Sequence, residues 1–309
     1  MTDTDHLLLT RFNLPSKGAE RYLRSSPDWL QSRVQLFERY CLPSVARQSE
    51  TGFHWIIYLD PESPPWLKQW IGETSRRFHS VFVPSFRATV SQKDVLSDLV
   101  ALTGHLAPRL ITTNLDNDDA LSPDFMSRVR ALSPEQGRVA IYVDNGLIVT
   151  TDGQSYVHRD PVNAFCSVSE PSDCAITCWA DWHTNLPDHM SVLHDAGPPA
   201  WIQVVHGHNV SNRVHGALVD PSSYTDALGP FAEALRRPTP AALRRDAFIW
   251  KPGRTLRDRM TQLIKHAILR MTGRSTLQRI NALRQRLRLT SAARQSTQPS
   301  QARGQLEEG

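Results

Sequence analysis

The residues best placed to do chemistry form one short acidic segment, Asp116-Asn117-Asp118-Asp119. The segment follows an apolar stretch, Arg109–Leu115, which has the composition of a buried strand. If the extended backbone continues, the two-residue period of a strand points Asp116 and Asp118 the same way. Two carboxylates about 4 Å apart repel by about 4 kcal/mol at an effective dielectric constant of about 20, so the pair needs a cation or must share a proton.

A divalent cation is the simpler way to balance this charge. Carboxylate and phosphate oxygens suit Mg²⁺ or Mn²⁺, which keep open positions for the diphosphate of a substrate. The metal would act as a Lewis acid on a departing nucleotide diphosphate. The competing interpretation is a solvated turn, in which Asp119 caps the helix that Ser122-Pro123-Asp124 opens.

The elements that must position this segment follow an alternating pattern. In the first 150 residues, apolar β-branched stretches alternate with helix-like ones, which is typical of parallel strands joined by crossover helices. We therefore predict an α/β fold with a mostly parallel sheet, which binds ligands at the carboxyl ends of its strands. The predicted strands are Leu7–Phe12, His54–Asp60, Ser80–Pro84, Arg109–Asp116, Arg138–Asp144 and Trp201–Val205.

A helix is expected between the first two strands. Ser25-Ser26-Pro27-Asp28 supplies an N-cap, a proline at the first helical position and an acid in the first turn, so the helix should run from about Pro27 to Gln48. Pro43 lies inside this stretch and has no backbone N–H to donate. We therefore expect a kink or a break there, with Leu42–Gln48 as a short second piece.

The charge of the chain is divided unevenly. Residues 251–309 hold 13 Lys and Arg against three Asp and Glu, whereas residues 1–250 hold 22 against 28. Past Arg254, the apolar residues up to Met271 form one helical stripe opposite basic and polar residues. We predict a main α/β domain over 1–250, a basic amphipathic helical extension over 251–290 and a disordered tail over 291–309.

Composition excludes several classes of protein. With 309 residues and 40% hydrophobic content the chain can bury a substantial core, and it resembles neither a coiled coil nor a disordered chain. It has no apolar run of the roughly 18–20 residues that a spanning helix needs, and no basic start to a signal peptide. Four cysteines are too few for a disulfide framework, so we expect buried thiols in a reducing cytoplasm: Cys41, Cys166, Cys174 and Cys178.

Several segments together resemble a known family. Leu42–Gln48 followed by Phe53–Asp60 is similar to the N-terminal signature of GT-A nucleotide-sugar glycosyltransferases, in which a helix precedes a strand closed by an aspartate near the nucleotide base. Thr112–Ala120 resembles the metal motif of these enzymes. With Leu9–Asn13 and His206–Asn212 added, the set resembles the bacterial family labelled putative rhamnosyltransferases, over roughly residues 6 to 220.

The resemblance implies a fold, a reaction and partners. The fold would be GT-A-like, that is, Rossmann-like with a mostly parallel central sheet flanked by helices, and would carry the C-terminal helical extension. The reaction would move rhamnose from dTDP-rhamnose to a hydroxyl of a bacterial surface polysaccharide or a lipid-linked glycan, and it inverts if the donor is β-linked and the product α-linked. Asp116 and Asp118 would hold Mg²⁺ or Mn²⁺, with His206 as a further ligand.

This sequence also departs from the wider pattern of GT-A enzymes at two places. Pro61-Glu62-Ser63 follows Asp60, where many of these enzymes have a second acid and a glycine, so different contacts to base and ribose are expected. Asn114 stands where related enzymes carry an arginine after the pair of threonines.

Other polar residues are candidates for binding the donor. Arg11, Asn13 and Asp60 end the first two predicted strands and are expected on the nucleotide side. After the last predicted strand, Asn209, Ser211 and Asn212 could donate to phosphate or to sugar hydroxyls, and as turn formers they have an equally good structural interpretation. The same holds for the histidines of this region, His206, His208 and His215, at least one of which could contact metal or phosphate.

An inverting transfer needs a general base for the acceptor hydroxyl. Asp181 is the first candidate because Trp179 and Trp182 beside it offer apolar faces on which sugars stack, and Glu170 and Asp188 are rivals. The alternative for the two tryptophans is simple core packing.

The sequence is also compatible with two other functions. A metal-dependent phosphatase or phosphotransferase would use the same carboxylates, but the aspartyl-phosphate kind needs a D-x-D-x-[TV] motif, and Ala120 follows Asp119 here. A non-enzymatic protein could bind anionic membrane through the basic helices between residues 254 and 290, where each Lys or Arg contributes about 1 kcal/mol. An enzyme with these helices would lie peripherally at the inner face of the cytoplasmic membrane. Nucleic acid is not expected, because the region has no aromatic platform and residues 1–250 are acidic.

Overall fold

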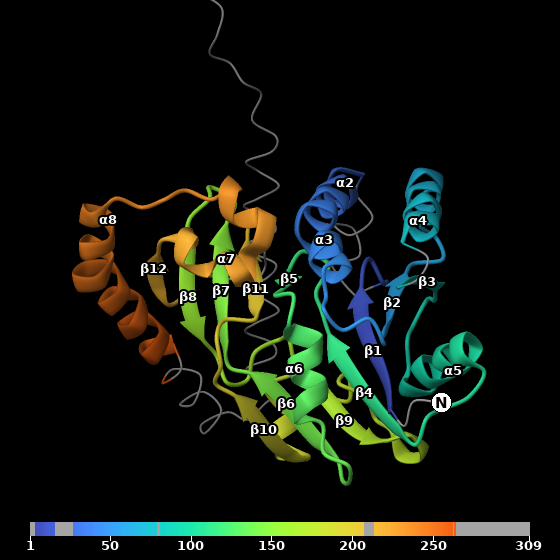
Figure 1. Ribbon diagram of the computed structural model, residues 1–309. Helices are drawn as coiled ribbons and strands as arrows, with labels where there is room; N and C mark the ends of the chain where they lie inside the picture. The colour runs from blue at the N-terminus through green and yellow to red at the C-terminus, as the bar shows by residue number, and fades with distance from the viewer. Residues whose placement is uncertain (1–3, 16–26, 79–80, 207–212, 262, 264–309) are drawn as a thin grey trace, which may run out of the picture. The chain divides into compact units, whose positions relative to one another are not determined.

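The computed structural model describes residues 4–15, 27–78, 81–206, 213–261 and 263. The chain divides into two compact units, residues 1–206 with 214–251, and residues 207–213 with 252–309. The first unit carries both sheets of the described residues and is shown in Figure 1. Of the second unit, residues 252–261 and 263 are helical. The rest of the predicted helical extension and the predicted tail lie outside the described residues.

A seven-stranded sheet forms the centre of the first unit (Figure 1). All neighbouring pairs are parallel except those of β9, which runs antiparallel to both its neighbours. The prediction of a mostly parallel α/β sheet is therefore confirmed, with β9 as its exception. In spatial order the strands are β10 (Ser191–Asp195), β6 (Val139–Val143), β9 (Ser167–Pro171), β4 (Arg109–Asn114), β1 (Thr4–Arg11), β2 (His54–Leu59) and β3 (Phe82–Phe86).

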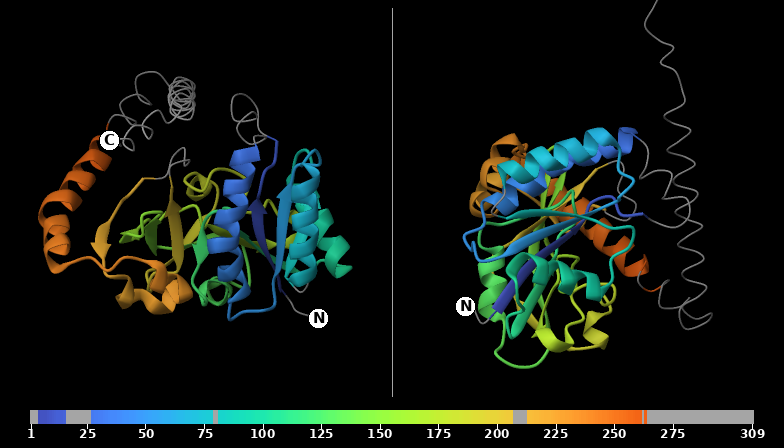
Figure 2. Two further views of the ribbon diagram at one scale, coloured as in Figure 1. Left: turned by 90° about the horizontal axis from the view of Figure 1, so that it is seen from above. Right: turned by 90° about the vertical axis from the view of Figure 1, so that its right-hand side faces the viewer.

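Helices cover both faces of this sheet, which is why its central strands are apolar on both sides (Figure 2). On one face, residues such as Leu8 and Ile57 pack against α2 (Pro27–Leu36), α3 (Leu42–Ala46), α4 (Pro65–Arg77) and α6 (Phe125–Leu132). On the other face, Leu7, Leu9 and Tyr58 pack against α5 (Gln92–Thr103) and the segment 175–190. That segment includes the 3₁₀ turn η3 (Leu186–Asp188) and follows η2 (Ser172–Cys174).

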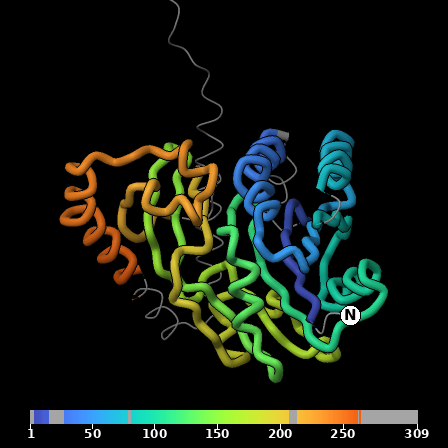
Figure 3. The backbone as a smooth tube through the Cα atoms, in the orientation of Figure 1, coloured from blue at the N-terminus to red at the C-terminus, as the bar shows by residue number. Residues whose placement is uncertain are grey.

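The predicted break at Pro43 is instead a widened turn. Helix α2 continues through a π-helical turn, η1 (Phe37–Cys41), into α3, and the backbone runs on without interruption (Figure 3). The N–H of Leu42 donates to the carbonyl of Phe37, five residues back. A π turn next to the proline lets the helix continue although Pro43 has no N–H to give. The expected separate piece Leu42–Gln48 is therefore the last turn of one continuous helix.

A second, five-stranded sheet stands beside the acidic segment. Its order is β12 (Ala217–Val219), β8 (Ser155–Arg159), β7 (Asn145–Thr150), β11 (Trp201–Val205) and β5 (Ala120–Leu121). Strand β11 is parallel to β7 and antiparallel to β5. Gly146 on β7 is needed for this packing, because an added Cβ would lie 2.0 Å from the indole ring of Trp201.

Short helical turns close the first unit after β12. They are η4 (Pro221–Tyr224), α7 (Thr225–Leu228), η5 (Gly229–Ala234), α8 (Pro240–Arg245) and the π-helical η6 (Asp246–Trp250). Among the helices of the described part of the chain, none is both long and apolar enough to cross a membrane. All four cysteines are free; three are buried as expected, but Cys174 is exposed because it lies in the surface turn η2.

Candidate active site

Strand register brings the predicted site residues to one edge of the central sheet. Leu9 of β1 is paired with Asn114 of β4, and the N–H of Leu115 donates to the carbonyl of Leu9 at 3.0 Å. On the other side of β1, the N–H of Phe12 donates to the carbonyl of Tyr58 on β2 at 2.9 Å. The ends of β1, β2 and β4 therefore lie side by side, at the edge where parallel sheets bind ligands.

Asp118 is a buried carboxylate with two basic partners. It is 5% exposed, and His206 Nε2 donates to its Oδ2 at 2.9 Å. Arg33 of α2 donates from Nη1 to the same oxygen at 2.5 Å and to Asn117 Oδ1 at 3.2 Å. Burial pushes the pKa of Asp118 upward, but the hydrogen bond from His206 and the positive charge of Arg33 outweigh it, so the pKa lies below its ordinary value.

Asp116 differs from Asp118 in its surroundings. It is open to solvent on one side and crowded by protein atoms on the other. This partial loss of water and the negative charge of Asp118 raise the pKa of Asp116, against a smaller opposing effect of Arg11 and Arg33. A carboxylate whose ionised form is penalised in this way has an unmet demand for positive charge.

Asp119 has a structural role. The N–H of Val204 on β11 donates to its Oδ1 at 2.8 Å, and the side chain is 1% exposed. The segment is a turn, but Asn117, Asp118 and Asp119 are buried in it and only Asp116 is exposed. The expected cap is wrong, since α6 begins at Phe125 and Asp119 bonds to β11 instead. Burial, followed by the charges of Asp118 and Asp116, raises the pKa of Asp119 well above its usual range.

The donor chemistry of these residues suits a divalent cation. Carboxylate oxygens from Asp116 and Asp118 and the imidazole of His206 are the ligand types that Mg²⁺ and Mn²⁺ accept. They do not form a closed cage: in the described ranges no three His, Cys, Asp or Glu groups converge on one point. His206 and Asp118 contact each other, and Arg33 supplies the positive charge at Asp118.

Trp179 joins the acidic segment to the nucleotide-side candidates. Its Nε1 donates to Asn114 Oδ1 at 2.7 Å, and the guanidinium of Arg11 lies 4.0 Å from the centre of its ring. Asn114 Nδ2 in turn reaches Asp116 Oδ1 at 3.5 Å. The asparagine that departs from the wider pattern thus links Trp179 to Asp116, whereas Trp182 is 74% exposed.

Asn13 and Asp60 hold the loops after β1 and β2 together. Asn13 is buried, donates from Nδ2 to Ser63 Oγ at 2.9 Å and accepts the N–H of Asp60 at 3.1 Å. Asp60 Oδ1 accepts the N–H of Glu62 at 2.8 Å. These contacts position the loops at the site edge, where Arg11 is exposed.

The three candidate bases lie in different surroundings. Glu170 is fully buried and is paired with Leu110, near the opposite end of β4 from Asp116. Its carboxylate binds Arg138 Nε at 2.6 Å and two backbone N–H groups, so it does not belong to the site. Asp188 is exposed in η3.

Asp181 is held within its own loop. It accepts hydrogen bonds from His189 Nε2 at 3.0 Å, from the N–H of Trp182 at 2.7 Å and from Asn185 Nδ2 at 3.1 Å. The hydrogen bond from His189, followed by the other two, lowers the pKa of Asp181. A lowered pKa makes a carboxylate a weaker base, so these contacts do not favour Asp181, whose role stays a prediction.

Of the remaining candidates, most lie outside the described residues: His208, Asn209, Ser211 and Asn212. His215 is described and stacks on His158 with ring centres 5.3 Å apart. Sequence reasoning missed Arg33, because a basic residue on an amphipathic helix has the same pattern whether it faces water or a carboxylate. Its only local signal is Trp29 one turn earlier, over whose ring the guanidinium lies at 5.0 Å.

Likenesses to solved structures are weak. S. aureus TarS 1–349 is 13% identical with a TM-score of 0.37, over 65% of this chain and 60% of that one. The mannosyltransferase PcManGT from Pyrobaculum calidifontis, in complex with GDP-Man and Mn²⁺, is 11% identical with a TM-score of 0.37, over 97% of this chain and 76% of that one. The chain thus spans less than two thirds of TarS 1–349. Similarity at this level does not support a conclusion about the function of this chain. A comparison with curated proteins found no match.

The sequence itself matches a family along more than half of its length. Residues 5–218 match the family described as "Putative rhamnosyl transferase". This range takes in β1, the acidic segment and His206, and it agrees with the predicted extent of the resemblance. The chain therefore belongs to the "Putative rhamnosyl transferase" family of glycosyltransferases.

Proposed function

We propose that this glycosyltransferase moves rhamnose from dTDP-rhamnose to a hydroxyl acceptor in bacterial surface polysaccharide synthesis, and that it depends on Mg²⁺ or Mn²⁺. The observation that carries the proposal is the carboxylate pair at the ends of β1 and β4, with solvent-open Asp116 beside enclosed Asp118. Family membership supports the sugar transfer, and the family description supports rhamnose.

Different residues of the chain would bind the cation, the diphosphate and the nucleoside of the donor. Asp116, Asp118 and His206 would hold the cation, which supplies Lewis-acid neutralisation of the leaving diphosphate. The positive charges of Arg11 and Arg33 both act on Asp116, and the two guanidinium groups can pair with phosphate oxygens. Asp60 is the candidate nearest the nucleotide base by its place after β2, and Asn209 and Asn212 stay predicted phosphate or sugar contacts.

The second unit supports a peripheral place on an anionic membrane. Its described helix exposes Leu256, Met260 and Leu263, spaced by one turn each, among the basic residues of the same helix. An apolar stripe flanked by Lys and Arg is typical of helices that lie in the membrane interface. An acceptor linked to lipid would be reached from there. Neither a phosphatase nor a membrane-binding protein without catalysis has an observation of its own in its favour.

Thermal stabilisation by nucleotides tests the donor side of the proposal. dTDP, UDP and GDP are added with and without Mn²⁺ to the wild type, to Asp118→Asn and to a matched control, Asp152→Asn, whose carboxylate is exposed in the turn after β7. A nucleotide at a hundred times its dissociation constant adds about 2.7 kcal/mol. We expect a metal-dependent shift for dTDP that Asp118→Asn loses and Asp152→Asn keeps. No shift for any nucleotide would overturn the proposal.

A further inference from the structure

A histidine and a buried aspartate form a pair outside the acidic segment. His194, on β10, bonds from Nδ1 to Asp144 Oδ1 at 2.7 Å, and Asp144 is 1% exposed. The other carboxylate oxygen accepts Arg159 Nη2 at 2.7 Å. The His194 side chain is 42% exposed, and within the described residues its Nε2 has no hydrogen-bond partner. A buried carboxylate at Nδ1 fixes the tautomer that leaves Nε2 able to accept a proton.

The pair lies at the same edge of the central sheet as the acidic segment. Ser167 of β9 is in register with Thr113 of β4 on one side and with Ile141 of β6 on the other. Asp116 and Asp144 each come three residues after these positions. Strands β4 and β6 run in the same direction, because both are antiparallel to β9, and they stand two strand spacings apart, about 10 Å.

Asn114, which bonds to Asp116, and His194 lie on the same face of the sheet. Asn114 on β4 accepts a hydrogen bond from Trp179, and the hydroxyl of Tyr142 on β6 donates to the carbonyl of His183 in the same segment. His194 is in register with Tyr142 and stacks on its ring, with centres 5.9 Å apart. His194 therefore lies on the face that the segment 179–183 borders, along the edge from Asp116.

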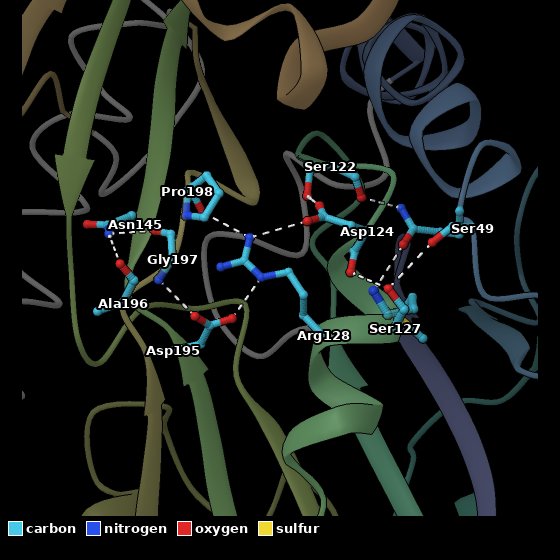
Figure 4. Close-up of polar contacts among 12 residues, drawn as sticks. Ser49, Ser122, Asp124, Ser127, Arg128, Asn145, Asp195, Ala196, Gly197 and Pro198 are labelled. Carbon is cyan, nitrogen blue, oxygen red and sulfur yellow. Dashed lines mark hydrogen bonds and ion pairs between the residues drawn. The ribbon is translucent and has the colours of Figure 1, made fainter.

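The backbone beside His194 is fixed by a polar network that Figure 4 shows. Arg128 of α6 donates from Nε to Asp195 Oδ2 at 2.7 Å and from Nη1 to the carbonyl of Pro198 at 2.9 Å. The N–H of Gly197 donates to Asp195 Oδ1 at 2.8 Å, and Asn145 holds the carbonyls of residues 196 and 197. Asp195 is committed to these bonds, and that with Arg128 lowers its pKa, so it is no rival base.

We propose that His194 is the general base of the transfer and that Asp144 is its positioning residue. This inference rests on the proposed function. The acceptor oxygen forms a bond to the anomeric carbon of the donor while the bond from that carbon to the diphosphate breaks. The bonding electron pair leaves with the nucleoside diphosphate, and the hydroxyl proton moves to Nε2 of His194. Asp144 then stabilises the imidazolium.

His194 stands far enough from the acidic segment to leave room for two substrates. Strand β10 is three strand spacings from β4, about 14 Å, so the donor sugar and the acceptor can lie between them. Arg159 binds the other oxygen of the Asp144 carboxylate. The groups that contact His194 are Asp144 and Tyr142; Arg159 is bound to the other oxygen of Asp144, and Asp195 follows His194 in the chain and is bound to Arg128.

The test compares transfer and nucleotide binding in four proteins: wild type, His194→Gln, Asp144→Asn and the matched control His105→Gln, which lies after α5 near the opposite edge of the sheet. Transfer from dTDP-rhamnose to p-nitrophenyl α-L-rhamnoside is followed against pH with Mn²⁺ present, and dTDP binding is measured by calorimetry. A general base contributes about 10²–10⁴-fold. We expect that loss in His194→Gln, with dTDP binding unchanged and the acid limb of the pH profile gone, a smaller loss in Asp144→Asn, and none in His105→Gln.

A second readout is independent of turnover. The ¹⁵N imidazole signals of His194 should show the Nδ1–H tautomer in the wild type and lose it in Asp144→Asn. An unchanged pH profile in His194→Gln, a loss of dTDP binding in that variant, or an acid limb that disappears in Asp181→Asn instead would overturn the assignment. If the wild type neither binds dTDP nor transfers rhamnose, the proposed function is wrong. If the wild type and His194→Gln both bind dTDP and transfer rhamnose equally well, only the assignment of His194 is wrong.

Discussion

Replacing Arg33 by methionine removes the positive charge nearest to Asp118 while keeping the length of the side chain. The ion pair that would be lost is largely enclosed, with side chains 14% and 7% exposed. Removing one partner of a buried pair costs about 3–5 kcal/mol, because the other charge stays buried and uncompensated. His206 still donates to Asp118, so we expect a lower cost for Arg33→Met, about 2–3 kcal/mol without metal.

Scanning calorimetry measures this loss directly. For a domain of this size each kcal/mol corresponds to roughly 2–4 °C, so Tm should fall by about 5–10 °C. The matched control is Arg39→Met in η1, an exposed arginine one and a half turns later on the same helix, which should stay within about 0.5 kcal/mol of the wild type. In a double-mutant cycle with Asp118→Asn, the two losses should be less than additive.

Mn²⁺ provides the sharper half of the experiment. A cation at Asp116 and Asp118 can replace the missing guanidinium, so Mn²⁺ should stabilise Arg33→Met more than it stabilises the wild type. Equal Tm values for Arg33→Met and Arg39→Met, or additive losses in the cycle, would refute the reasoning about Arg33.

Three further predictions concern other parts of the chain. Burial lowers the pKa of His6 to about 3, so below pH 6.5 the unfolded chain binds a proton that the folded chain does not bind. The free energy of unfolding should therefore fall as pH drops, by up to about 1.4 kcal/mol per pH unit. In melting curves measured against pH, His6→Gln should flatten this slope. Gly146→Ala should abolish stable folding because its Cβ would overlap the indole of Trp201, whereas Gly72→Ala in α4, with nothing within 4 Å, should raise Tm; melting curves decide both. Met260→Asp should weaken sedimentation with vesicles that contain phosphatidylserine, and equal binding by wild type and variant would remove the apolar stripe from the proposal.

The central sheet could be predicted where local sequence and tertiary environment agree. Strands β1, β2 and β4 are near-continuous apolar stretches, and their positions were predicted within a few residues. Strand β9 was not predicted, because the sequence Ser167–Pro171 is polar. In the fold its buried serines and Glu170 form hydrogen bonds with β4, Arg109 and Arg138, and these partners come from distant parts of the sequence. Pro43 shows the same limit, since its missing N–H predicts a disturbance but not that a π turn absorbs it.

The candidate site divides in the same way. The acidic segment could be found because three carboxylates in four residues are a local signal. Arg33 meets Asp118 across 85 residues, and His194 meets Asp144 across 50, so neither contact has a sequence pattern. Asp119 was expected to cap a helix but bonds to β11, because β5 carries the chain into the second sheet directly after it. At this site, the sequence therefore did not predict which residue pairs with each charged side chain.

The balance of those charges decides how a diphosphate can enter. Asp116 and Asp118 face the guanidinium groups of Arg11 and Arg33, so the described residues of the site carry no surplus positive charge before the donor brings its own negative charges. A diphosphate beside two carboxylates therefore needs a cation, whereas an uncharged nucleoside does not. In calorimetry, Mn²⁺ should strengthen dTDP binding at least about tenfold, or 1.4 kcal/mol, and should leave thymidine binding nearly unchanged. The effect of Mn²⁺ on dTMP binding should lie between these two. Equal dTDP affinity in Mn²⁺ and in EDTA would mean that Arg11 and Arg33 turn from the carboxylates to the phosphates, and that the site works without a metal.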